Sequence, residues 1–491
     1  MTPDLLLPAS VLAPLTLACL TALTRGRATV ALGLVGTALS ALLAVAVAVV
    51  VALDGPFQHE LAGWSPPLGI ALRADGLSAV LLGLTAVVGT ATAGYAATRA
   101  TTYGGHRSFW PLSLLLWAGM AGVLVTADLF NTYVALEVVT LAAVGLVALG
   151  GRESWGPALR YLLVAVLGSM FYLLAVVAIY GMTGTLDMAQ AGAIIAADPS
   201  ADTRWPLALA VVGLGLKGAL LPLHAWLPPA HASAPAAVSP LLSGLVVKAG
   251  FVVLVRLWFE VLGPDPAVAT LLAWAAGAAV VVGGVLALVQ SSLKRVVAYS
   301  TVAQVGYFFL LFPVTLGVDD PDLQRTLWSG VLLILLAHGL AKAALFLAAG
   351  SLQLAAGSDQ LTEIVGAARQ LRTTTAAMML AAVSLVGLPI SLGFSGKWLL
   401  FSGAVQTDQW WVVALVIVGS LLSAAYLLRP LATLLLASDT TQEVEPVDLS
   451  ALPRTLRHVP LALGLLVILL GLNAEWLATL SVTGLPTGGA P

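Results

Sequence analysis

The sequence predicts an all-α polytopic membrane protein with about 14 transmembrane helices, in which two inverted five-helix repeats each contain a broken helix. Three observations lead to this fold class. Hydrophobic residues make up 60% of the 491 residues and charged residues only 9%, whereas soluble proteins carry about 25% charged residues. Apolar runs long enough to cross a bilayer recur along the whole chain. Proline and glycine interrupt two of these runs beside a lysine, as in transporters built from inverted repeats.

The apolar runs define the predicted elements, because a helix needs about 20 apolar residues to cross the hydrocarbon core. We expect fourteen spans, centred in residues 5–24, 28–53, 76–98, 109–127, 129–150, 159–182, 205–223, 240–262, 267–289, 296–317, 326–350, 375–402, 410–436 and 456–477. The longest polar stretches, 54–75, 351–374 and 437–455, are predicted to be loops.

These spans group into four predicted parts. Residues 1–107 form an N-terminal three-helix segment, and 108–265 form a first five-helix repeat. Residues 266–437 form the second repeat, which starts on the opposite side of the membrane because five crossings are an odd number. Residues 438–491 form an inner loop and a C-terminal helix.

Basic residues set the predicted orientation. With the N-terminus outside, the inward loops collect twelve Lys and Arg residues and the outward loops only three, which satisfies the positive-inside rule. Both termini are therefore expected outside the cell membrane. The first span is expected to be retained, since its basic residues follow the apolar run instead of preceding it as in a signal peptide. Arg256 and Arg429, near helix ends, are expected to snorkel to the interface.

Several function classes lack support in the sequence. The single cysteine, Cys19, excludes a disulfide framework and any CxxC metal or iron–sulfur site. The chain contains no GxSxG, HExxH or GxxxxGK[ST] motif. A net charge of -2 gives no argument for a nucleic-acid partner. We therefore expect a secondary transporter and not an enzyme, with no cofactor and no bound metal.

The five lysines are placed differently from the arginines. Nearly all sixteen arginines lie in loops or at helix ends, whereas Lys217, Lys248, Lys342 and Lys397 fall inside predicted spans and Lys294 opens another. A charge at the bilayer centre costs about 2.5–3.5 kcal/mol or more on insertion scales. A buried lysine can lose its proton, whereas arginine stays charged. This division indicates proton exchange along a line of buried lysines.

Three further groups join the lysines. Glu137 is the only acid well inside a span, and its natural partner is Lys217. His338 and Lys342 are four residues apart and share a helix face, which suits a proton relay. For a single buried charge, an ion pair that only fixes helix packing is an equal alternative. The set as a whole favours ion transport, because apolar residues would pack there at no such cost.

Two predicted spans are interrupted in corresponding positions. Residues 213–228 contain Pro222 just after Lys217, and residues 384–401 contain Pro389 and three glycines before Lys397. Each segment belongs to the fourth helix of its five-helix block. Proline frees backbone carbonyls inside the membrane, which is tolerated where they line a polar cavity. We expect two half-helices at each site.

The chain resembles the antiporter-like proton-translocating subunits shared by Mrp-type cation/proton antiporters and respiratory complex I. The resemblance covers about residues 70–435. It rests on PLHAWLPPAHASAPAAVSPLLSGLVVKAGFVVLVR (222–256), SLKRVVAYSTVAQVGY (292–307), HGLAKAALF (338–346) and GFSGKWLLF (393–401). The Ala-His-x-x-Ala-Pro pattern at 230–235 is most similar to the D subunit of Mrp-type sodium/proton antiporters. One departure is Pro229, where the family commonly has aspartate.

The resemblance implies roles for particular residues. Glu137 and Lys217 would be the coupled pair, Lys248 a central relay, and Lys397 the terminal proton-exchanging lysine, with His338 and Lys342 linking the two halves. His224 and His231 would serve either in proton uptake or in capping a half-helix. Implied partners are other membrane subunits of a hetero-oligomeric antiporter, with H+ and Na+ as transported ions in a lipid bilayer. The alternative function is the proton-pumping membrane subunit of complex I or a membrane-bound hydrogenase.

Overall fold

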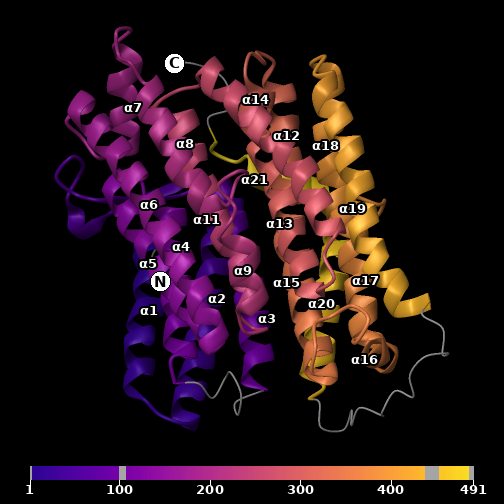
Figure 1. The fold of residues 1–491 in the computed structure, drawn as a ribbon. Coiled ribbons are helices and arrows are strands. Elements are labelled where there is room, and N and C mark those ends of the chain that lie inside the picture. Colours follow the sequence, from indigo (N-terminus) through magenta and orange to yellow (C-terminus); the bar gives the residue numbers. More distant parts are fainter. Residues whose placement is uncertain (1–2, 99–106, 437–452, 486–491) are drawn as a thin grey trace.

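The protein is a bundle of helices in the computed structural model, which describes residues 3–98, 107–436 and 453–485 (Figure 1). Within these residues, 11 helices are long and apolar enough to cross a membrane. Every one of the fourteen predicted spans overlaps helix in the structure. The number of crossings and the inverted relation of the two five-helix blocks remain predictions.

The N-terminal part contains a small sheet within a stretch that the sequence predicts to be loop. Helices α1 (Pro3–Leu23), α2 (Arg27–Asp54) and α3 (Gly76–Ala97) are the first three predicted spans. Strands β1 (Phe57–Glu60) and β2 (Ala71–Ala74) pair antiparallel between α2 and α3, with the short η1 (Leu61–Gly63) between them. Helix α3 begins directly after β2, and Asp75 is its N-cap, accepting a hydrogen bond from the Ser78 amide.

The first five-helix block has its break where the sequence predicts it. Helix α8 ends at Gly218, the C-cap Ala219 is left-handed, and turns occupy most of the following positions up to the start of α9. The short apolar helix α7 and two π-helical turns, η2 and η3, are additional to the predicted elements. The elements are α4 (Phe109–Val125), α5 (Leu129–Ala148), α6 (Arg152–Thr183), α7 (Met188–Ala197), α8 (Arg204–Gly218), α9 (Leu227–Ser233), α10 (Ser239–Leu241), η2 (Leu242–Val246), α11 (Val247–Arg256) and η3 (Leu257–Val261).

The second block is interrupted in the same way. Helix α17 ends at Gly387, which is left-handed, and α18 begins five residues later with Ser391 as its N-cap. The elements are α12 (Pro266–Leu288), α13 (Leu293–Phe309), α14 (Leu311–Thr315), α15 (Pro321–Ala356), α16 (Val365–Gln370), α17 (Arg372–Val386), α18 (Leu392–Gln406), α19 (Trp410–Leu436), α20 (Thr455–Leu469), η5 (Leu470–Asn473) and α21 (Ala474–Ser481).

Burial separates central helices from peripheral ones. The most apolar stretches of Ser239–Val261 and Pro321–Ala356 are wholly buried inside the protein, whereas Arg27–Asp54 and Trp410–Leu435 are less than half buried. In Figure 1, α11, α13 and α15 run between the N-terminal helices and the group formed by α17, α18 and α19. The central helices therefore meet protein on all sides, and protein can supply the hydrogen bonds that lipid cannot.

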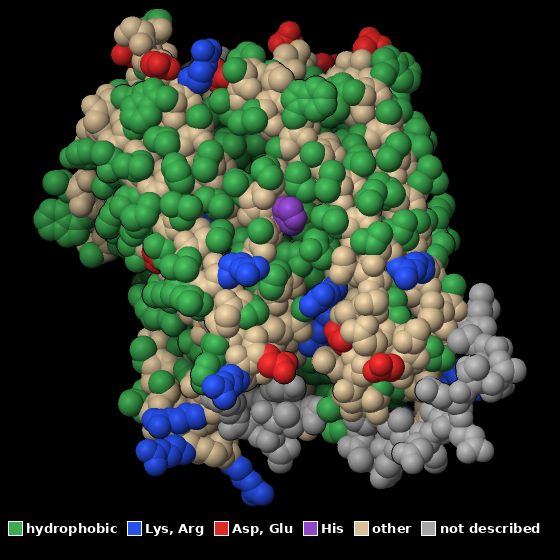
Figure 2. Space-filling view, viewed as in Figure 1, with side chains coloured by type: hydrophobic (Ala, Val, Ile, Leu, Met, Phe, Trp, Pro, Cys, Tyr) green, Lys and Arg blue, Asp and Glu red, His purple; other side chains and the backbone are tan. Residues whose placement is uncertain are grey.

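Charge divides the two ends of the bundle. On the face shown in Figure 2, most Lys and Arg side chains lie toward the lower end, and acidic side chains also cluster at the upper end. Hydrophobic side chains cover much of the surface between them. This distribution is that of a bilayer-spanning protein. The predicted assignment of the basic end to the cell interior stays a prediction.

Candidate functional site

All five lysines are buried. Their exposed fractions are at most 6%, and they sit on α8, α11, α13, α15 and α18. The sequence predicts Lys294 at the opening of a span, near a loop, but the structure buries it in the first turn of α13. Because an unpaired buried charge is costly, the oxygen and nitrogen atoms around each ammonium group define what the site can do.

Glu137 and Lys217 form the predicted ion pair. Helix α5 carries Glu137, and the Lys217 Nζ lies 3.3 Å from its Oε1. Lys217 also donates a hydrogen bond to Thr140 Oγ1 at 2.9 Å, one turn after Glu137 on α5. Ser169 of α6 donates a short hydrogen bond to the same carboxylate. The pair thus joins three helices beside the break that ends α8.

Lys248 is paired with His338 and not with an acid. Its Nζ lies 3.1 Å from His338 Nδ1 and donates to the Ser243 carbonyl at 3.2 Å. Ser243 lies in the π-helical turn η2, and such turns recur at functional sites. His338 Nε2 is buried without a hydrogen-bond partner among the described residues. One imidazole nitrogen therefore contacts an ammonium group and the other is open to a further partner.

In the part of the chain that the structure describes, Lys342 makes no hydrogen bond to His338, although their spacing predicts that they share a helix face and form a relay step. The two side chains share α15, as predicted, but Lys342 donates to Val297 O at 3.0 Å and, by a short contact, to Ser300 Oγ. Both acceptors belong to α13. On α15, His338 thus faces the first block through Lys248, and Lys342 faces the second block through α13.

Lys397 is held by the break in its own segment. Its Nζ donates to Leu385 O at 3.0 Å, Val386 O at 2.9 Å and Ser420 Oγ at 3.1 Å. The two carbonyls are the last in α17, and α17 stops at Gly387. A helix C-terminus carries partial negative charge from its unpaired carbonyls. The broken helix therefore supplies the acceptors that a carboxylate would supply elsewhere.

The histidines of the α8–α9 connection differ from each other. His231 is fully buried and stacks on Phe346 with ring centroids 4.8 Å apart, and neither of its ring nitrogens has a partner in the described part of the chain. His224 is partly buried, and its Nδ1 likewise lacks one. Nearby, Lys294 donates to Ala234 O at 3.1 Å. Capping of a half-helix is not seen for His231, so its role in proton uptake stays a prediction.

Arg256 does not snorkel as the sequence suggested. It is 5% exposed and donates to both carboxylate oxygens of Asp75, at 2.5 and 2.8 Å, and to Glu260 at 2.7 Å. Glu260 in turn pairs with Arg73 of β2 at 2.5 Å. Burial raises the pKa of Asp75, but the Arg256 guanidinium beside it holds the pKa below its usual range. This network anchors the hairpin to η3 and the end of α11.

Sequence reasoning missed a set of neutral polar residues. Side chains of α13 and α19 come together at the C-terminal end of α17, whose Leu385 carbonyl also accepts from Lys397: Gln304, Ser423 and Tyr426. The available signal was the spacing of Ser300, Gln304 and Tyr307, which recur every three to four residues on one face of a predicted span.

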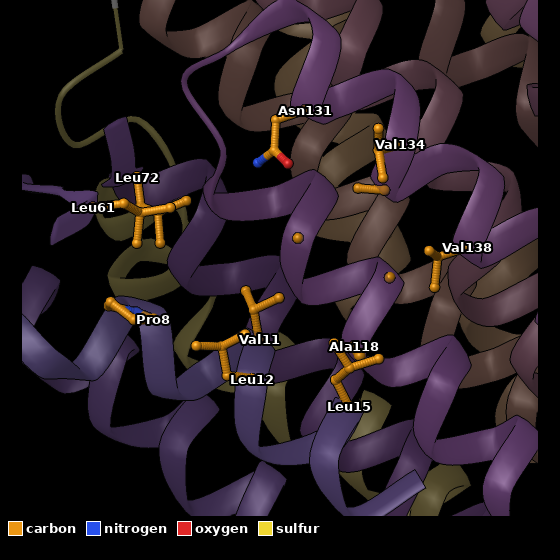
Figure 3. Close-up of a pocket in the computed structure, with 13 residues that line it drawn as sticks. Pro8, Val11, Leu12, Leu15, Leu61, Leu72, Ala118, Asn131, Val134 and Val138 are labelled. Carbon is orange, nitrogen blue, oxygen red and sulfur yellow. The ribbon is translucent and has the colours of Figure 1, made fainter. Parts of the chain in front are cut away.

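A separate apolar pocket carries none of these groups. It has a volume of about 240 Å³ and lies between α1, α4, α5 and the hairpin (Figure 3). Of the residues labelled in Figure 3, Asn131 alone has a polar side chain, and the others present aliphatic carbon. The charged site and this cavity are therefore different parts of the protein.

Comparison with known proteins identifies the family of the chain. The family described as "NADH:quinone oxidoreductase/Mrp antiporter, TM" matches residues 126–423, more than half of the chain. The chain belongs to this family. The matched region contains Glu137 and the lysines from Lys217 to Lys397.

The individual relatives are named as subunits of two different complexes. The chain is 36% identical over 449 residues to the N subunit of the NADH-quinone oxidoreductase of Desulforudis audaxviator, a match that covers 88% of each chain. It is 30% identical over 389 residues to the D subunit of the Na+/H+ antiporter of Alkalihalophilus pseudofirmus, a match that covers 78% of this chain and 76% of the relative. A chain in the structure of the Mrp complex from Dietzia sp. superimposes with a TM-score of 0.86 at 25% identity, over 98% of this chain and 97% of that chain. The fold is thus that of the membrane subunits of Mrp antiporters and complex I.

Proposed function

We propose that this chain is the ion-translocating subunit of a multisubunit sodium/proton antiporter, and that protons move along its buried charged residues at mid-membrane. The observation that carries the proposal is the set of Glu137, Lys217, Lys248, His338, Lys342 and Lys397, called the row below. A half-buried acid, Glu137, lies in one bundle with a buried histidine and a buried lysine from each of α8, α11, α15 and α18, and each is within hydrogen-bond distance of a polar group. A stable bundle needs none of them, since apolar packing there would avoid the cost of burying charge.

Each pairing in the row can hold a proton in two ways. The Glu137 carboxylate stabilises the Lys217 ammonium, and proton transfer between them would leave both groups neutral. The Lys248 ammonium can pass its proton to the unprotonated Nδ1 of His338, which leaves a neutral amine and an imidazolium. Within the described part of the chain, Lys342 and Lys397 donate to neutral oxygens alone. The ammonium forms of Lys342 and Lys397 therefore depend on protons delivered from the neighbouring residues of this set.

A second candidate function rests on the relative named for complex I. The 36% identity to the N subunit of an NADH-quinone oxidoreductase over 88% of the chain favours the proton-pumping membrane subunit of a redox complex. The match to the D subunit of an antiporter and the TM-score of 0.86 to an Mrp complex chain favour the antiporter. Both functions use the same buried row, so these residues cannot separate them.

The partners and the sodium dependence of transport separate the two functions. The complex containing this chain is purified from its native membrane under mild detergent and its chains are identified. The antiporter proposal expects small membrane subunits and, in everted vesicles, a pH gradient that collapses on addition of Na+. Co-purification of flavin and iron–sulfur proteins, with no effect of Na+ on the pH gradient, would overturn it in favour of the redox complex.

A further inference from the structure

We propose that the hydroxyl groups of Ser423 and Tyr426, positioned by Gln304, form the proton link between Lys342 and Lys397. The inference rests on the proposed function, because it names residues through which protons would pass in the second half of the row. The three residues are neutral, and each is 1% exposed. They lie on α13 and α19, the helices that flank the C-terminal end of α17.

The three side chains form one hydrogen-bonded cluster. Ser423 Oγ lies 3.0 Å from Tyr426 Oη, and either hydroxyl can be the donor. Gln304 Nε2 lies 3.3 Å from Ser423 Oγ and 3.4 Å from Tyr426 Oη. A hydroxyl can accept one proton while it releases its own, whereas an amide such as Gln304 holds its protons. Gln304 is therefore a positioning residue, and the two hydroxyls are the conducting groups.

A shared carbonyl connects this cluster to Lys397. Leu385 O accepts from Lys397 Nζ at 3.0 Å and from Gln304 Nε2 at 3.4 Å. Lys397 Nζ also donates to Ser420, which precedes Ser423 by nearly one turn on α19. In addition, Lys397 Nζ lies 5.0 Å from the centre of the Tyr307 ring. The cluster therefore borders the same atoms that hold the ammonium group.

Helix α13 connects the cluster to Lys342. Ser300 contacts Lys342 Nζ and lies four residues before Gln304, so the two side chains share one face of the helix. Ser300 and Gln304 are both buried, at 0% and 1% exposed. Polar groups thus continue along α13 from the contact of Lys342 toward the cluster.

The alternative is that the cluster only holds α13, α17 and α19 together. The three bonds from Gln304 Nε2 position the hydroxyls in either case. The Ser423–Tyr426 bond at 3.0 Å distinguishes the two roles, because either hydroxyl can be its donor. A proton-conducting pair needs this reversal, whereas a packing contact does not.

The transfer conserves charge at each step. The Lys342 ammonium gives a proton to the Ser300 oxygen, whose own hydroxyl proton moves to a water molecule. That water passes a proton to the Ser423–Tyr426 pair, where each hydroxyl accepts one proton and releases another. The hydroxyl pair passes its released proton through a second water to Ser420 Oγ, whose own hydroxyl proton goes to the neutral Lys397 amine that it contacts. The resulting ammonium group donates to Leu385 O, Val386 O and Ser420 Oγ. One positive charge moves, and only N–H and O–H bonds change.

The test uses the intact complex in everted vesicles, with sodium-dependent collapse of a pH gradient measured at equal protein levels in H2O and D2O. Tyr426→Phe removes one hydroxyl and keeps the ring. Ser423→Val and Ser423→Thr have the same added bulk, but only threonine keeps the hydroxyl. Tyr172→Phe is the matched control, since Tyr172 is also fully buried and its Oη donates to Leu129 O in the first block.

We expect Tyr426→Phe and Ser423→Val to slow exchange at least about tenfold, since positioned proton-transfer groups contribute about 10²–10⁴-fold to rates. Their solvent isotope effect should rise above that of the wild type, while Ser423→Thr and Tyr172→Phe stay near wild-type rates. Equal losses in Ser423→Val and Ser423→Thr, or slower exchange with an unchanged isotope effect, would make the cluster structural and overturn the link. Wild-type vesicles without Na+-dependent exchange would instead defeat the antiporter function.

Discussion

The two broken helices hold their lysines by different means. At the first break, Lys217 pairs with the Glu137 carboxylate of a separate helix, and the carbonyl of Leu216 at the end of α8 accepts from Trp226 Nε1 at 2.8 Å. At the second break, the two final carbonyls of α17 accept directly from Lys397 Nζ. None of the ion pairs among the described residues includes Lys397.

The charged lysine is thus stabilised by a counter-ion at the first break and by backbone carbonyls at the second. In the first block, the charge on Lys217 is compensated by an acid that has its own protonation state. In the second block, the charge on Lys397 is compensated by dipoles that cannot change. Protonation of Lys217 is therefore coupled to Glu137, whereas protonation of Lys397 depends on the shape of the break and on its neighbours on α13 and α19.

The largest expected effect is at the carboxylate. Glu137→Ala should abolish cation/proton exchange while the complex still assembles, because it leaves Lys217 buried without its counter-ion and favours the neutral amine. Exchange is measured in everted vesicles at equal protein levels. Glu153→Ala, at an exposed acid in the first turn of α6, is the control and should be silent. Near-normal exchange in the Glu137→Ala complex would show that the ion pair is structural.

The second effect concerns the lysine without a carboxylate. Lys397→Arg should lose exchange almost as fully as Lys397→Ala, with expression and assembly retained in both. Arginine keeps the charge, but its pKa above about 12 prevents it from releasing a proton. The assay is again sodium-dependent collapse of a pH gradient. Substantial activity in Lys397→Arg together with loss in Lys397→Ala would mean that a fixed charge suffices at the second break.

The Lys397→Arg variant replaces one cationic side chain with another, so it needs a control substitution of the same kind. From sequence alone, Lys294→Arg is the natural choice, because Lys294 is predicted near a loop. The structure buries Lys294 against Ala234 O, so a larger guanidinium there would disturb packing. Arg325→Lys is the better control, because Arg325 is largely exposed and its ion pair among the described residues is with the exposed Asp322. It should leave exchange unchanged.

Sequence alone located the charges but not their partners. A charge in an apolar run has a large, local energetic signature, so the lysines, Glu137 and both breaks could be predicted from composition and proline placement. Which atoms meet depends on how helices rotate against one another. His338 and Lys342 share a face, yet one contacts Lys248 and the other contacts α13. Neutral side chains such as Gln304 and Tyr426 carry no such signature, because serine, glutamine and tyrosine occur in ordinary helix contacts.

The remaining errors share a tertiary cause. The β1–β2 hairpin lies in a predicted loop because its strands are only four residues long and give too weak a pattern. Arg256 is wrongly predicted at the interface because sequence position cannot show that Asp75, far away in the chain, reaches it. In both cases, a long-range contact supplies the stabilisation that local sequence lacks.

The smallest expected effect compares the residues at which the two breaks begin. Ala219 and Gly387 both have left-handed backbones, with φ of 56° and 86°. Such a conformation costs a residue with a Cβ about 1–2 kcal/mol, whereas glycine loses more freedom on folding. Gly387→Ala should therefore destabilise the complex by at least about 1 kcal/mol, since the new Cβ would also lie 2.7 Å from Lys397 Cδ.

Ala219→Gly should be close to neutral, because relief of strain offsets the greater entropy of the unfolded chain and the loss of a buried methyl group. Thermal unfolding of the detergent-purified complex measures both changes. Exchange should fall in Gly387→Ala, where the added methyl group presses on Lys397, and persist in Ala219→Gly, where Lys217 is held by Glu137. Equal effects of the two substitutions on exchange would mean that both lysines depend on the breaks alike, and the contrast between carboxylate and backbone would fail.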